Sequence, residues 1–441
     1  MPSDLQALLA AIVADPSDDV ARLVYADCLE ENGNSARAVF IRLQIEAQRL
    51  HPASRDRANL ERQVDEILQA NWSEWWGEVC TAIGFPAPVP KPATLLGRFA
   101  RRFSSLVTGA PYTRSGCWLN RAPVVPDPKV FGGFSGVWFR RGFLEDVTVA
   151  GPGDFLRGWV KASPLHSLTF HTAYHGWWLD GPHLAGVRAV ALLRGGDNAL
   201  PRVLESPHLG NLEDLALPLP GDQGPTASAN DLTLVVNSPR ARQLKRLAVS
   251  VWDDRAAELL ASTASFAGLE SLGVFLEREV GRDPVGASRR LATLARSPHL
   301  AGLKELDIQG SLDPDGIAAA GRQPTWTGLR KLSLGLSFGY NRLDPLAEPD
   351  GVPQLDDLRL NDVWINAAEV DVLVRSPLLK RLRHFALAGA ANYRPVLALL
   401  TSALDITRIE TFSLALPRVE LPGSDGTDAL RQHFGDKLQL L

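Results

Sequence analysis

The chain has 441 residues, more than one compact domain usually contains, so we expect several domains or an array of repeats. Hydrophobic residues make up 45% of the sequence and charged residues 22%, as in ordinary folded proteins. The formal net charge is −4, which excludes a protein that coats nucleic acid or a membrane with its whole surface.

The cysteines and the N-terminus indicate a cytoplasmic location. Cys28, Cys80 and Cys117 are odd in number and far apart, so we expect neither a zinc site nor a disulfide framework. The N-terminus lacks the basic region and cleavage site of a signal peptide. No apolar run approaches the roughly 18–20 residues that cross a bilayer. We therefore expect no membrane contact, no bound metal and no cofactor.

Four amphipathic helices are predicted at the start of the chain. Ser3-x-x-Gln6 can form a capping box, and Asp15-Pro16 ends the first helix. Asp18 or Asp19 can cap the second, which stops at Asn32-Gly33. A third carries Val39 to Leu50, and a fourth starts at about Arg55. Short links between such helices favour a small bundle, docked on the first repeat by Trp72, Trp75 and Trp76.

Two runs in these helices carry a family resemblance. RLVYADCLEENG (residues 22–33) and FIRLQ (residues 40–44) resemble the bacterial repeat-companion domain. Cys28 stands where a tryptophan is usual in that family, and Val39 where an acidic residue is usual. The resemblance implies a helical N-terminal module, without established catalytic activity, ahead of leucine-rich or other repeats.

The charged residues of these runs have two interpretations. Asp27, Glu30 and Glu31 have spacings that acid–base chemistry can use. Alternatively, Asp27 pairs with Arg22 or Arg42 to tie neighbouring helices, while the glutamates face water. We adopt the structural interpretation and predict that the chain is not an enzyme and has no catalytic residues.

Residues 86–141 are predicted to be a Pro-rich linker with a basic and aromatic insertion. PAPVPKP opens the segment, and eight basic residues against Asp127 give residues 98–141 a charge of 8 − 1 = +7. Residues 1–79 hold seven basic and fourteen acidic side chains, a net of −7, so the two segments could pair. Basic and aromatic residues together also suit single-stranded nucleic acid. The candidate contacts are Arg98, Arg101, Arg102, Arg114 and Trp118. The alternative is a connector whose aromatic residues cover the end of a repeat array.

A leucine-rich trio recurs along the remaining chain, as in Leu303-x-x-Leu306-x-Ile308. Most successive starts lie 21–27 residues apart, within the 20–29 period of leucine-rich repeats. The starts are Leu144, Leu165, Val187, Leu212, Leu244, Leu269, Leu303, Leu329, Leu355, Leu382 and Ile409. Apolar segments between them predict convex-face helices, which Ser-Pro pairs often end. The predicted helices include Ala256–Ser265, Val285–Ser297, Ala367–Ser376 and Pro395–Leu404.

Residues between the buried leucines should face the concave side of the sheet. Small residues dominate its central column, which either forms a trough for a partner or eases curvature. Charged side chains of the C-terminal half either bind a partner protein or pair laterally. These candidates are Glu305, Asp307, Lys331, Asp357, Arg359 and His384. His166, His171 and His175 are predicted to lie at the surface or in turns rather than to bind metal.

The predicted fold class is therefore α/β, a leucine-rich-repeat solenoid preceded by a small all-α bundle. Residues 1–85 form the helical domain, 86–141 the linker and 142–441 the repeats. The predicted function is a non-enzymatic scaffold that binds an unidentified protein on its concave face. The alternative is nucleic-acid binding through residues 98–141.

Overall fold

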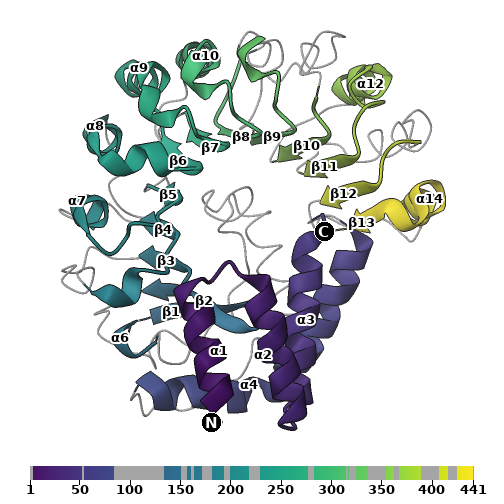
Figure 1. The fold of residues 1–441 in the computed structure, drawn as a ribbon. Helices are drawn as coiled ribbons and strands as arrows, with labels where there is room; N and C mark the ends of the chain where they lie inside the picture. Colours follow the sequence, from purple (N-terminus) through teal and green to yellow (C-terminus); the bar gives the residue numbers. More distant parts are fainter. Residues whose placement is uncertain are drawn as a thin grey trace. The chain divides into compact units, whose positions relative to one another are not determined.

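Figure 1 draws the fold of the computed structural model. The chain divides into two compact units. One unit comprises Met1–Phe99 and Arg121–Ala216, and the other Ala100–Asn120 and Leu217–Leu441. Each unit combines strands with helices. The structure describes residues 3–51, 54–83, 134–149, 156–159, 163–170, 181–192, 199–217, 229–276, 283–313, 316, 324–335, 354–361, 367–388, 407–415 and 425–440.

The first unit begins with four helices, as the sequence predicts. They are α1 (Ser3–Ala14), α2 (Asp19–Glu31), α3 (Ser35–Arg49) and α4 (Arg55–Ile83). Asp18 is the residue that caps α2, because its carboxylate accepts hydrogen bonds from the amides of Val20 and Ala21. Asn34 caps α3 by accepting from the amide of Arg37. Local side-chain chemistry thus fixes where these helices start.

The apolar faces of the first three helices share a core that reaches the neighbouring strands. Leu5 and Ile12 of α1, Tyr25 of α2 and Ile41 of α3 are buried in one cluster. Phe143, which follows about a hundred residues later in the chain, belongs to the same cluster. The helices therefore do not complete a core by themselves.

The strands of the first unit follow one another in chain order. Strand β1 is antiparallel to β2, whereas β2 to β5 are mutually parallel. Val147, Leu168, Val190 and Leu215 are register neighbours and are all buried. The strands are β1 (Phe134–Arg140), β2 (Phe143–Val149), β3 (Ser167–Phe170), β4 (Ala189–Leu192) and β5 (Asp214–Ala216). The helices among them are α6 (Leu156–Trp159), η2 (Pro182–Leu184) and α7 (Ala199–Glu205).

Strand β1 lies inside the segment 86–141, which the sequence predicts to be a linker. Arg141 and Gly142 join β1 to β2 with φ values of 46° and 91°. Positive φ at both central residues is typical of a type I′ turn, whose twist matches that of the flanking strands. The last part of this segment is thus a β-hairpin. The division into the three predicted domains stays a prediction.

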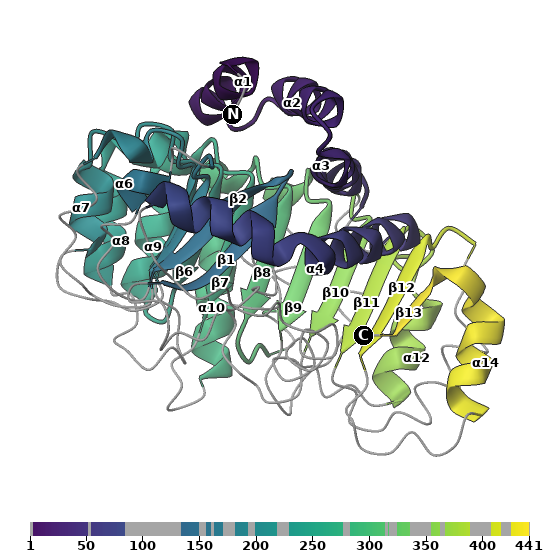
Figure 2. The ribbon, with the colours of Figure 1, turned by 90° about the horizontal axis from the view of Figure 1, so that it is seen from below.

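The second unit contains parallel strands that also follow chain order (Figure 2). Leu272, Leu306, Leu332 and Leu358 are register neighbours with exposures of 0–1%. The predicted trios therefore supply one continuous apolar row. The strands are β6 (Arg246–Ser250), β7 (Ser271–Phe275), β8 (Glu305–Gln309), β9 (Lys331–Gly335), β10 (Asp357–Asn361), β11 (His384–Ala388), β12 (Thr411–Ala415) and β13 (Leu438–Leu440).

Helices lie along one side of these strands in Figure 1. Three match predicted segments, namely α9 (Asp254–Ser262), α10 (Pro284–Ala295) and α12 (Ala367–Arg375). The predicted helix Pro395–Leu404 lies outside the described residues. The remaining helices are α8 (Ala229–Asn237), η3 (Pro239–Gln243), η4 (Ala264–Phe266), η5 (Pro298–Leu300), η6 (Pro324–Trp326), α14 (Asp425–Phe434) and η8 (Gly435–Lys437).

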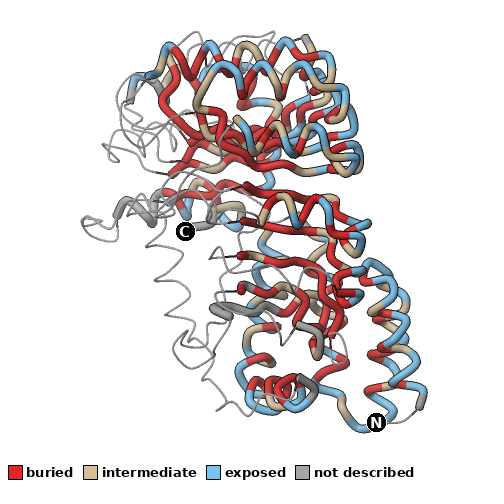
Figure 3. The backbone as a smooth tube through the Cα atoms, turned by 90° about the vertical axis from the view of Figure 1, so that its left-hand side faces the viewer, coloured by how far each residue is buried: buried red, intermediate tan, exposed pale blue. Residues whose placement is uncertain are grey.

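The Ser-Pro pairs act where the sequence predicts. Ser238 and Ser297 follow α8 and α10 closely, and each caps a short 3₁₀ helix that begins with its proline. Buried residues follow the strands in Figure 3. The described part of the chain thus has the repeating strand-and-helix pattern of a solenoid-like α/β fold. No helix in that part is long and apolar enough to cross a membrane.

Candidate functional site

Register pairing brings the six predicted partner-binding residues of the second unit to one face of strands β8–β11. Glu305, Lys331, Asp357 and His384 form one row, and Asp307 and Arg359 belong to the row two residues further along. Side chains alternate across a strand, so these rows lie opposite the buried leucine row. We call this set of six residues the charged face.

An ion pair joins the first two strands of the charged face. Lys331 Nζ lies 3.4 Å from Glu305 Oε2, and the two side chains are 24% and 51% exposed. Such a pair contributes little to stability because water screens it. Both groups therefore remain accessible to another molecule.

Asp357 and Arg359 pair within strand β10. The guanidinium donates to both carboxylate oxygens, with Nη2–Oδ2 at 2.9 Å and Nε–Oδ1 at 3.1 Å. Burial lowers the pKa of Arg359, but Asp357 and then Asp307 and Glu305 raise it, so that the net shift is upward. Arg359 is thus a permanent cation on a mostly anionic surface. Asp357 is buried beneath it.

His384 is also buried rather than exposed. Its Nδ1 lies 2.8 Å from Thr411 Oγ1 on β12, and its Nε2 lies 3.9 Å from Glu410 Oε2. The charged residues therefore combine the two predicted possibilities. Some pair laterally with neighbouring side chains, and some stay accessible to a partner. Glu305, Asp307, Lys331 and Arg359 are at least partly exposed, whereas Asp357 and His384 are buried.

A second polar cluster, in the first unit, was not predicted as one site. Arg22 Nη1 of α2 lies 2.5 Å from Glu145 Oε1 of β2, and both side chains have 0% exposure. Arg141 Nη2 lies 3.6 Å from Glu145 Oε2 and also contacts Pro16 O. Burial raises the pKa of Glu145, against the opposing influence of Arg22 and Arg141. Arg22 therefore ties α2 to the hairpin, so of the two predicted partners of Asp27 it is not Arg22 that links neighbouring helices.

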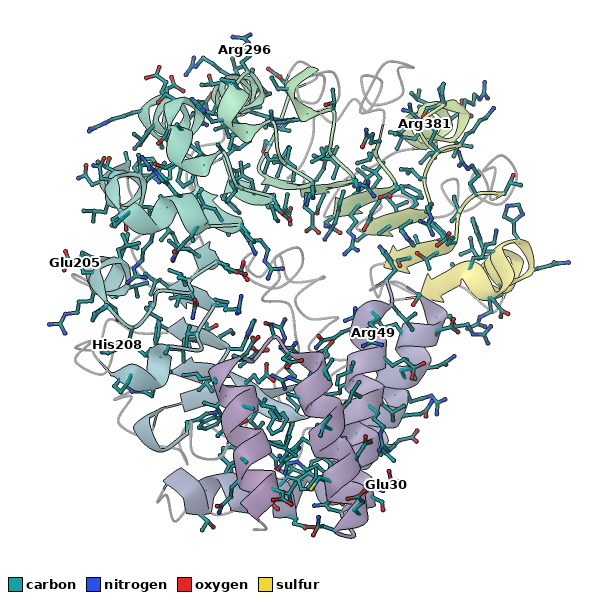
Figure 4. The ribbon with its side chains drawn as sticks, viewed as in Figure 1. Glu30, Arg49, Glu205, His208, Arg296 and Arg381 are labelled. Atoms are coloured by element: carbon teal, nitrogen blue, oxygen red, sulfur yellow. The ribbon has the colours of Figure 1, made fainter. Side chains whose placement is uncertain are left out.

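Arg42 does tie neighbouring helices. Its Nη2 lies 2.6 Å from Asp27 Oδ1 and 2.7 Å from Glu30 Oε2, so it links α3 to α2. Glu30 lies on the outside of α2, where Figure 4 labels it. Two of the three carboxylates that acid–base chemistry would need, Asp27 and Glu30, are thus engaged in an exposed ion-pair network.

The predicted tryptophan ridge packs on the hairpin. The rings of Trp72 and Trp75 lie 6.1 and 5.8 Å from that of Phe139 on β1. Phe40 of α3 packs between them at 4.9 Å from Trp75 and 5.2 Å from Phe139. Phe139 belongs to β1, which precedes the first predicted repeat, so docking of the helices on that repeat by Trp72, Trp75 and Trp76 stays a prediction.

His166 lies inside the first unit, so the prediction that it is a surface or turn residue is wrong. Its side chain is buried, and its amide donates to Glu145 O of the neighbouring strand. Burial lowers its pKa to about 2, helped by Arg140, Arg141, Arg188 and Arg22. His171 and His175 lie outside the described residues. Nothing in the sequence around His166 marks it as buried except its place directly before a strand.

Comparison with solved structures finds similarity to a protein from Bacteroides fragilis and to the Rad7 and Elc1 complex in yeast. The first is 14% identical, and the match covers 64% of this chain and 75% of that chain at a TM-score of 0.37. The second is 15% identical, with 63% and 80% covered and a TM-score of 0.37. No protein-family model and no curated protein matches the sequence.

The structure provides less information on the remaining predicted sites. The candidate nucleic-acid contacts Arg98, Arg101, Arg102, Arg114 and Trp118 lie outside the described residues, so that alternative stays a prediction. Among the described residues, no group of three His, Cys, Asp or Glu side chains is placed to hold a metal ion. Burial raises the pKa of the Cys80 thiol to about 11, so this thiol is protonated at neutral pH.

Proposed function

We propose that the chain is a non-enzymatic interaction scaffold that binds another protein through the charged face. The observation that carries this proposal is the placement of four accessible charged side chains, Glu305, Asp307, Lys331 and Arg359, on adjacent parallel strands. Backbone hydrogen bonds between neighbouring strands hold these groups at fixed separations. Charges fixed in this way give a partner specificity and a faster encounter.

The finer classification is part of the same proposal. We take the strand-and-helix units as leucine-rich repeats, about eleven in number, and helices α1–α4 as a module of the repeat-companion type. Repeat arrays present wide surfaces built from many short units, and their function is determined by the side chains on those surfaces. We also place the protein in the bacterial cytoplasm, in keeping with the free thiols of Cys28 and Cys80.

A reciprocal charge swap tests the proposal. The double variant Glu305→Lys with Lys331→Glu keeps an ion pair between β8 and β9 but reverses its polarity. A partner first identified by cross-linking to the wild-type protein is purified, and its affinity for each variant is measured. The swap should weaken binding about tenfold or more, the usual size for a close interfacial charge pair. The free energy of unfolding should stay near the wild-type value.

Arg296→Glu is the control for reversing a single charge away from the charged face. Arg296 is exposed at the C-terminal end of α10, where Figure 4 labels it, and its replacement changes the net charge by the same amount as Lys331→Glu. It should leave the affinity unchanged. Binding that tolerates the swap, or that responds equally to Arg296→Glu, contradicts the assignment of the charged face.

A further inference from the structure

Five residues of the two runs that carry the repeat-companion resemblance converge on one element, the turn between β1 and β2. Arg22 and Tyr25 come from α2, and Phe40, Ile41 and Gln44 come from α3. Each of the five contacts the hairpin within residues 139–145. This shared target is not evident from the spacing of the residues in the helices.

Helix α3 contacts the backbone of the turn through Gln44 and Ile41. Gln44 Oε1 accepts a hydrogen bond of 2.6 Å from the amide of Gly142, and Gln44 Nε2 donates to Phe139 O at 3.5 Å. A Cβ on Gly142 would lie 2.1 Å from Ile41 Cγ1, and φ of Gly142 is +91°. Two independent constraints, space and backbone conformation, therefore admit only glycine at this position.

Helix α2 contacts the residues that flank the glycine, through Arg22 and Tyr25. Arg22 donates to Arg141 O at 3.2 Å and forms the buried ion pair with Glu145. Arg22 also lies 5.2 Å from the ring of Phe143, which packs on Tyr25 at 5.3 Å. A buried cation without its carboxylate is strongly unfavourable, so this surface selects for a glutamate at the position of Glu145.

Arg141 completes the match from the side of the hairpin. Its guanidinium lies 3.1 Å from Asp19 Oδ1 and donates to the backbone oxygen of Ser17. Arg141 and Arg22 both donate to Pro16 O, which is one reason that the Asp15-Pro16 corner sits against the turn. The link between α1 and α2 and the first residue of α2 thus hold the arginine of the turn.

We propose that the surface formed by Arg22, Tyr25, Ile41 and Gln44 is a recognition site for a β-hairpin turn of sequence Arg-Gly-Phe-x-Glu. In this chain its ligand is the turn Arg141–Glu145, bound within the same molecule. The helical module is then a binding module rather than only a set of packed helices. Its specificity for the turn comes from the glycine, the arginine and the glutamate of the turn. The tryptophan ridge buries apolar area but does not distinguish between turn sequences.

Cleavage of the folded protein tests this recognition. A specific protease site is inserted between Pro92 and Ala93, and the folded full-length protein is cut there. The two halves should remain associated during size-exclusion chromatography. Their dissociation constant is then measured by dilution of a labelled sample. Gly142→Ala should raise this constant about 100-fold or more, because it combines a steric overlap with an unfavourable φ.

Gln44→Ala is the milder companion variant. It removes two hydrogen bonds but leaves the buried ion pair, so it should fold and raise the dissociation constant about tenfold. Arg42→Ala, which removes an exposed ion-pair network away from the turn, is the matched control and should change it by less than about threefold. Halves of the wild-type protein that separate on cleavage overturn the proposal. So does a dissociation constant that Gln44→Ala leaves unchanged, or that Arg42→Ala raises as much.

Discussion

Nη1 of Arg22 lies 2.5 Å from Oε1 of Glu145, and neither side chain reaches solvent. Removing one member of such a pair leaves a buried charge without compensation. Glu145→Gln should therefore lower the free energy of unfolding by about 3–5 kcal/mol, measured by urea denaturation. Glu30→Gln, which affects the exposed pair with Arg42, should cost less than about 1 kcal/mol. Similar losses for the two variants would mean that the Arg22–Glu145 pair is not buried.

Stability should depend on pH through His166. The folded state keeps this imidazole neutral, since its pKa of about 2 lies far below the ordinary value of 6.5. Below pH 6.5 the unfolded chain binds a proton that the folded chain does not, so stability is lost as pH falls. The loss should approach about 1.4 kcal/mol per pH unit.

A comparison with His166→Gln isolates this contribution. Glu145 titrates in both proteins, so its contribution cancels in the difference between their unfolding free energies. That difference should shift in favour of the variant between pH 7.5 and pH 5. A difference that is independent of pH would show that His166 has the same pKa in the folded and the unfolded chain, and would contradict its burial as a neutral group.

Side chains alternate between the two faces of strand β8, so substitutions at two adjacent residues should lower the free energy of unfolding by unequal amounts. Leu306 is 1% exposed within the apolar row, so Leu306→Ala should cost about 2–5 kcal/mol. Asp307 lies on the other face, where its carboxylate accepts a hydrogen bond of 3.3 Å from Gln309, and Asp307→Ala should cost about 1 kcal/mol. Thermal unfolding of the two variants provides the measurement. Equal costs would require the opposite strand phase.

The N-cap of α9 offers a local test. Asp253 accepts a hydrogen bond of 2.7 Å from the amide of Ala256. Asp253→Ala should cost about 1 kcal/mol, whereas Asp253→Asn, which keeps an acceptor, should cost only a few tenths. Denaturation curves distinguish these outcomes. An equal loss for Asn would show that the charge, rather than the hydrogen bond, stabilises the helix.

The apolar repeats made most of the strands predictable. Leu306 and Ile308 fall on one face of β8 because a strand alternates, and each of the eleven predicted trios leads into a strand. Helix starts were predictable where a short polar side chain precedes an apolar period, as at Asp18. These features depend on neighbours in sequence, and a single sequence reports such neighbours well.

The hairpin and the buried cluster depend on distant residues. Arg22 and Glu145 are separated by 145 − 22 = 123 positions, and nothing local to either indicates the other. Arg141-Gly142 between apolar runs was the available signal for the turn, but the surrounding arginines suggested nucleic-acid contact instead. On the charged face, the sequence placed the six residues together but could not show that Asp357 and His384 are buried.

The contacts at the tip of the hairpin couple the substitutions that helices α2 and α3 tolerate to those that the hairpin tolerates. Gly142 admits only glycine because of its φ of +91° and its closeness to Ile41, whereas loss of the positive charge at Arg22 requires a neutral residue in place of Glu145. A chain in which only one member of the arginine–glutamate pair has changed is less stable than a chain that keeps both or has changed both. Related chains should therefore keep the glycine and should either keep the arginine and the glutamate or exchange both together, and a helical module should be transferable between chains only together with its hairpin.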